Sequence, residues 1–129
     1  MTRDEFINSW FNNLEKALYF YKKARREGLL SLEQELANLV DEMSDILKIG
    51  LRLTVDGHDY KMIEKILSKI VNREKDEYLY LLKTIKKETI LMIQQGINSR
   101  TIALVLNSYT DIPLNDSRFQ KLLGDFCDG

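Results

Sequence analysis

The chain has 129 residues, of which 44% are hydrophobic and 30% are charged, and its formal net charge is −1. This length and composition are typical of a single globular domain whose core is large enough to fold without disulfides. A net charge so close to zero provides no global field for nucleic acid or for a membrane surface, and no apolar run is long enough to span a membrane. The single cysteine, Cys127, and an N-terminus without an apolar stretch predict a cytoplasmic protein.

The first predicted helix begins near Arg3 and ends before Gly28. Thr2 and Glu5 have the spacing of a capping box. Apolar residues then recur at three- and four-residue steps as far as Ala24, which is the pattern of an amphipathic helix. Cations crowd its last turns, where they favour the helix dipole: Lys22, Lys23, Arg25 and Arg26. Gly28 is expected to take the left-handed conformation that ends such helices.

A second helix is predicted from Ser31 to about Leu53, before a turn at Val55–Asp59. Ser31 and Gln34 repeat the capping-box spacing, and the helix has a potential pause near "DEMSD", where Asp41 or Ser44 could cap a restart. Together with the first helix it would form an antiparallel hairpin within residues 1–58, which end in a turn.

The third prediction is one long helix. Asp59 is a good N-cap, Gly96 is a good stop, and nothing in Tyr60–Gln95 obviously breaks the pattern, so this helix would be about 50 Å long. Short helices would follow in residues 97–129. The predicted fold is therefore all-α: residues 1–129 form a single elongated helical bundle, built on the hairpin, the long helix at 59–96 and the short C-terminal helices.

No catalytic constellation is visible in the sequence. His58 is the single histidine and lies in a turn between acids, whereas a metal site usually gathers three or four ligands. Cys127 is flanked by Asp125 and Asp128, whereas a reactive thiol needs a cationic environment. Glu33 and Glu35 are expected on exposed helix faces. We therefore expect no enzyme activity, no metal and no cofactor.

The charges on either side of Gly28 allow two interpretations. The cations and the following glutamates would complement the dipoles of one helix that ends and another that begins. Alternatively, they form a charged tip that meets another protein. Glu27 and Glu33 mix the local field, so this cluster does not predict binding to nucleic acid.

Two sequence blocks favour the second interpretation. The stretch "ARREGLLSLEQEL", followed by "GLRLTVDGHDYKMIEKIL", resembles the cytoplasmic segment of the MotA family, the A subunit of the flagellar stator. The first block is carried by Gly28–Glu33 and the second by Gly50–Gly57. The resemblance covers roughly Tyr21 to Val71, less than half of the chain.

The resemblance implies a binding function. Members of the family are membrane proteins that form an ion-driven motor with a B subunit, and charged residues of their cytoplasmic segment engage the rotor protein FliG. By motif position these charges correspond to Arg25 and Glu33, with Arg26 and Lys22 beside them. The chain departs from the family where a membrane helix is expected, because it continues with the charged stretch "NREKDEYLYLLKTIKKETI".

We therefore expect a soluble protein-interaction domain that binds rotor or stator components and does not itself conduct ions. The alternative is a helical structural or regulatory protein without a motor role. Such a protein would form a homo-oligomer through the long helix.

Overall fold

The computed structural model describes residues 1–39 and 45–127, and these residues form seven helices and no strand. The all-α prediction is confirmed. In chain order the helices are α1 (Arg3–Glu27), the 3-10 helix η1 (Leu29–Asn38), α2 (Asp45–Val55), α3 (Tyr60–Val71), α4 (Glu77–Gln95), α5 (Ser99–Asn107) and α6 (Ser117–Phe126).

Helix α1 begins as its sequence predicts. The Thr2 hydroxyl accepts a hydrogen bond from the Glu5 amide at 3.1 Å, and the Glu5 carboxylate accepts one from the Thr2 amide at 2.9 Å. This capping box satisfies two backbone donors that the first turn would otherwise leave unpaired. The apolar stripe of α1 is buried, and Trp10, Leu14 and Leu18 have no exposed surface. Burial of this stripe holds α1 in the bundle.

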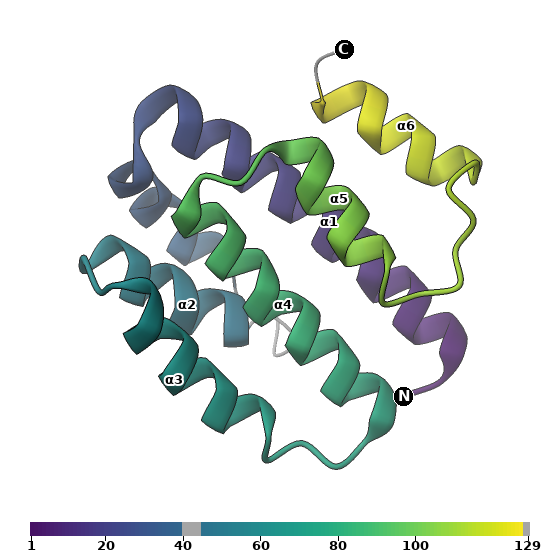
Figure 1. The fold of residues 1–129 in the computed structure, drawn as a ribbon, viewed down its shortest axis with the longest axis horizontal. Coiled ribbons are helices and arrows are strands. Elements are labelled where there is room, and N and C mark those ends of the chain that lie inside the picture. The colour runs from purple at the N-terminus through teal and green to yellow at the C-terminus, as the bar shows by residue number, and fades with distance from the viewer. Residues whose placement is uncertain (40–44, 128–129) are drawn as a thin grey trace.

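Helix α4 lies at the centre of the bundle, beside α1 (Figure 1). It packs against α1, α2, α3 and α5, so that Leu82 and Ile85 are completely buried. Helix α2 approaches α4 very closely at Gly50, where an added Cβ would lie 2.5 Å from the Ile90 side chain. Helices α5 and α6 cover the other side of α1, and the Trp10 indole nitrogen donates to the Leu106 carbonyl at 2.9 Å.

The prediction of one long helix is wrong. The stretch Tyr60–Gln95 is divided into α3 and α4, which lie side by side in opposite directions (Figure 1). Asp76 causes the restart, because its carboxylate accepts from the Leu79 amide at 2.9 Å and caps α4. The fold-back covers apolar residues that a single projecting helix would have left exposed. It also removes the reason for expecting an elongated bundle and self-association through this helix.

The predicted second helix also differs from the structure. Its first part is η1, a 3-10 helix of 10 residues, and α2 begins at Asp45. The Ser31 hydroxyl donates to the Gly28 carbonyl at 2.6 Å, so it does not cap a helix together with Gln34. The expected restart at Asp41 or Ser44 lies outside the described residues. Because η1 packs on α1 while α2 packs on η1, α3 and α4, the return arm of the hairpin is η1.

Candidate functional site

The tip comprises the last turns of α1 from Lys22 to Glu27, then Gly28, then η1 as far as Glu35. The Gly28 amide donates to the Ala24 carbonyl at 2.8 Å and closes α1. Gly28 has a φ of 89° and a ψ of 158°. The positive φ agrees with the prediction that glycine ends this helix, although ψ places it outside the left-handed helical region. An L-residue would be strained in this conformation, so Gly28 permits the turn from α1 into η1.

The four residues predicted to bind a partner all lie at this tip, but they differ in exposure. Arg25 and Arg26 are exposed, and neither forms an ion pair within the described chain. Glu33 is also exposed, at 62% of its side chain, and lies 3.4 Å from the Arg52 guanidinium on α2. Lys22 is half-buried and lines a shallow pocket of about 330 Å³ together with Arg26. The tip therefore presents cations from α1 and an acid from η1.

Near the exposed charges, a polar network that the sequence analysis did not predict gathers around one buried carboxylate, that of Glu35. Glu35 is 8% exposed and accepts hydrogen bonds from the Lys23 ammonium at 2.8 Å and the Tyr19 hydroxyl at 3.0 Å. The Asn38 amide also donates to it at 3.3 Å, and Lys23 donates to the Gln34 side chain at 2.9 Å. The network ties η1 to α1 and fixes the backbone that carries Arg25 and Glu33.

The network also changes the acidity of its members. Burial opposes ionisation of Glu35, but the hydrogen bonds from Lys23, Tyr19 and Asn38 outweigh it, so the pKa of Glu35 lies below its ordinary value. The hydrogen bond to Glu35 raises the pKa of Lys23. A hydrogen bond to the same carboxylate raises the pKa of Tyr19. Lys23 and Glu35 are therefore both charged at neutral pH.

The prediction that Glu35 is solvated is wrong. Glu35 lies one turn after the completely buried Leu32, on the side of η1 that packs on α1, where Lys23 and Tyr19 donate to it. The one available sequence signal was Lys23, a cation twelve positions earlier that needs a partner as α1 becomes buried.

The rest of the described chain offers few candidate residues for a metal or catalytic site. Within residues 1–39 and 45–127, no three His, Cys, Asp or Glu side chains gather where they could hold a metal ion. No helix in these ranges is long and apolar enough to cross a membrane. His58 is exposed in the turn that precedes α3, and Cys127 is buried at the end of α6.

Comparison with known proteins gives one partial similarity. The chain is 48% identical over 46 residues to Motility protein A of Borreliella burgdorferi. These residues are 36% of this chain and 16% of that protein, so the similarity spans one segment of each. No protein family model matches the chain, and no solved structure matches it.

The similarity indicates a segment related to Motility protein A and agrees with the family resemblance seen in the sequence. Because the matched protein is a motility protein, the similarity points to motility as the general context. The roles of individual tip residues stay predictions.

Proposed function

We propose that this chain is a cytoplasmic protein-interaction domain of the flagellar motor, which acts by binding and not by catalysis. In this proposal the tip meets a charged surface of the rotor protein, or of the stator units, through Arg25, Arg26, Lys22 and Glu33. The observation that carries the proposal is the partial similarity to Motility protein A, together with the exposure of Arg25 and Glu33 at one turn of the fold.

The electrostatics of the tip support a steering role. Exposed charges of opposite sign favour the rate and register of an encounter more than its affinity, and their effect is screened by salt. The Lys23–Glu35 network lies near these charges, so the backbone that carries them is fixed before a partner arrives. A fixed tip loses little conformational entropy on binding.

The test reverses the two charges, Arg25→Glu with Glu33→Lys, and measures binding to the rotor protein at low and moderate salt. We expect the double variant to bind at least about tenfold more weakly at low salt, and the difference to shrink as salt rises. The thermal midpoint should change by only a few degrees, because exposed charges contribute about 0–1 kcal/mol each.

A matched control exists on α6, where Lys121 and Asp125 form an exposed ion pair at 3.1 Å. Lys121→Glu with Asp125→Lys also reverses one cation and one acid without changing the net charge, and it should leave rotor binding intact. Rotor binding through the tip is contradicted if the unmodified protein does not bind the rotor protein at low salt, or if the tip variant and the control bind equally well; the same comparison is then made with the stator units.

A further inference from the structure

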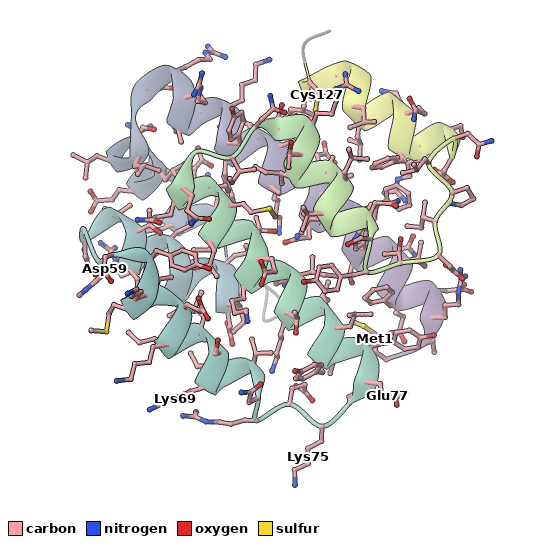
Figure 2. All side chains as sticks on the ribbon, viewed as in Figure 1. Met1, Asp59, Lys69, Lys75, Glu77 and Cys127 are labelled. Carbon is pink, nitrogen blue, oxygen red and sulfur yellow. The ribbon has the colours of Figure 1, made fainter. Side chains whose placement is uncertain are left out.

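Acids and cations alternate in the sequence of α3 and the turn after it, but in the structure the cations are exposed and the acids are not. Within residues 61–75, all of which the structure describes, the exposed residues are five cations, one methionine and one asparagine: Lys61, Lys65, Lys69, Arg73, Lys75, Met62 and Asn72. We call the five cations the basic ridge. Lys61, Lys65 and Lys69 follow one another at four-residue steps, so they occupy one side of α3, and Arg73 and Lys75 lie in the turn that follows it. Figure 2 shows Lys69 and Lys75 extending outward from the edge of the molecule.

The acids of this segment, and Asp76 just after it, are half-buried and accept hydrogen bonds. Glu74 accepts from the Lys83 ammonium at 2.7 Å and from the backbone amides of Lys75 and Asp76. Asp76 caps α4. Glu64 is half-buried and accepts a hydrogen bond from the Tyr60 hydroxyl, which raises the pKa of Tyr60.

The basic ridge is therefore not neutralised locally. Among the residues that the structure describes, none of its five cations forms an ion pair. Exposed acids lie at its two ends, Asp59 before α3 and Glu77 after the turn, and not within it. A chain of net charge −1 thus carries a local positive surface that its composition conceals.

The chemistry of the ridge favours anionic lipid over a protein or nucleic acid. Four of its five cations are lysines, which are depleted at specific protein interfaces, whereas arginine and aromatic residues are enriched there. Proteins that bind nucleic acid usually carry a strongly basic domain, and this chain has a sequence pI near 5.9. Clusters of four to eight cations on an amphipathic helix are typical of surfaces that bind anionic headgroups. Met62, which is 45% exposed among the lysines, adds an apolar side chain that can enter the headgroup region.

We propose that the basic ridge of α3 docks the protein on the surface of a membrane that contains anionic lipid headgroups. Helix α3 lies at one edge of the bundle and stays packed on α2 and α4, so docking requires no unfolding (Figure 1). This inference does not depend on the charged tip, which is formed by α1 and η1.

The experiment is co-sedimentation of the full chain with phosphatidylcholine vesicles, either pure or containing about 30% phosphatidylserine. The test variant is Lys61→Gln with Lys65→Gln and Lys69→Gln. Each lysine near an anionic surface is worth about fivefold in binding, so the triple variant should bind about 100-fold more weakly. The unmodified protein should bind the anionic vesicles at about 50 mM salt, release them at about 300 mM salt, and not bind pure phosphatidylcholine.

The matched control removes three exposed cations that are scattered over α2, α5 and α6: Lys48→Gln, Arg100→Gln and Lys121→Gln. It has the same net charge as the test variant and should retain most of the vesicle binding. Circular dichroism should show that both variants keep the helical content of the unmodified protein.

Three results would overturn the proposal. One is no sedimentation of the unmodified protein with anionic vesicles at about 50 mM salt. Another is an equal loss in the test variant and the control, which would mean that net charge and not the ridge is responsible. The third is binding to duplex DNA but not to the vesicles, with the same loss in the test variant, which would assign the ridge to nucleic acid.

Discussion

Glu33 and Glu35 are two positions apart in the chain, but the fold gives them different environments. Glu33 is exposed and has one long contact to Arg52, while Glu35 is buried and accepts three side-chain hydrogen bonds. Removing a charge from an exposed residue costs little stability, whereas removing one partner of a buried network leaves the others unsatisfied. At the residue scale, then, Glu33 is available to a partner and Glu35 serves the fold.

The first prediction concerns the dependence of stability on pH. The pKa of Glu35 is lower in the folded protein, so its charge stabilises the fold above the ordinary pKa of glutamate and ceases to do so as pH falls through the lower, folded value. Glu35→Gln should therefore lower the thermal midpoint at pH 7. The difference in thermal midpoint between this variant and the unmodified protein should shrink as the pH falls from about 5 to about 3. Thermal melts across this range test the prediction, with Glu33→Gln as a control that changes the midpoint little. The prediction would be contradicted if Glu35→Gln lowered the thermal midpoint by the same amount at pH 5 and at pH 3.

The second prediction concerns the contact between α2 and α4. Gly50→Ala places a methyl group 2.5 Å from the buried Ile90 side chain, which is branched at Cβ and cannot easily move away. Overpacking costs about 1–3 kcal/mol, and the better helix propensity of alanine returns up to about 1 kcal/mol. The free energy of unfolding should therefore fall by about 1–2 kcal/mol in denaturant titrations.

Gly124 on α6 is the matched control, because a Cβ there would meet no atom within 4 Å. Gly124→Ala should raise the free energy of unfolding by about 0.5–1 kcal/mol through helix propensity alone. If both alanine variants changed the free energy of unfolding in the same direction, close packing against Ile90 would not explain the effect at Gly50.

At the scale of the element, the break between α3 and α4 determines the architecture. Five residues, Asn72 to Asp76, turn the chain back, and Asp76 supplies the cap that makes the restart of the helix favourable. The break places α3 against α4 and exposes the basic ridge along the outer side of α3. A continuous helix would have left the side of α4 that now packs on α3 without that cover.

The third prediction tests this cap. Asp76→Ala should lower the thermal midpoint by about 3–6 °C, because the first turn of α4 loses the acceptor for the Leu79 amide. Asp76→Asn should have a much smaller effect, since asparagine caps helices nearly as well as aspartate. Thermal melts by circular dichroism measure both variants. An alanine variant that melts together with the asparagine variant would show that the cap does not stabilise the break.

At the scale of the whole molecule, the N-terminal helix α1 packs against the C-terminal helices as well as the middle of the chain. It packs on α4 and η1 through one part of its surface and on α5 and α6 through another, so the C-terminal helices complete its burial. Phe119 on α6 is completely buried, and its ring lies 6.1 Å from that of Trp10. Arg118 lies over the Phe11 ring at 4.4 Å and adds a cation–π contact between the same two helices. These contacts predict that α6 unfolds with the rest of the bundle.

The fourth prediction is that Phe119→Ala lowers the free energy of unfolding by about 3–5 kcal/mol, the usual cost of removing a buried aromatic ring. Trp10, the single tryptophan, reports on this contact by fluorescence, and circular dichroism reports on the helices. The two signals should change together in denaturant. Leu114→Ala is the control, since Leu114 is 55% exposed and its loss should cost less than about 0.5 kcal/mol. An α6 that detaches separately would give a fluorescence change well before the loss of helix.

Local signals in the sequence determined the helical class and several helix ends. The Thr2 capping box, the Asp59 cap and the glycines at 28 and 96 act over three or four residues, so they could be interpreted without knowledge of the fold. The exposure of Arg25 and Arg26 also followed from their position at a helix end. Their role, and that of Glu33, rests on the family resemblance and on the experiment that tests it.

Only the tertiary structure decided where the long apolar pattern would fold back and which charges would become buried. Asp76 is a competent cap in any sequence, but a helix is interrupted there only because the fold-back lets α3 and α4 cover each other. Glu35 became buried because η1 packs on α1 beside Lys23, and Glu74 accepts from Lys83 while the neighbouring Arg73 and Lys75 stay exposed. These outcomes depend on contacts between residues far apart in the chain, and the free energy of those contacts is not encoded in any local pattern.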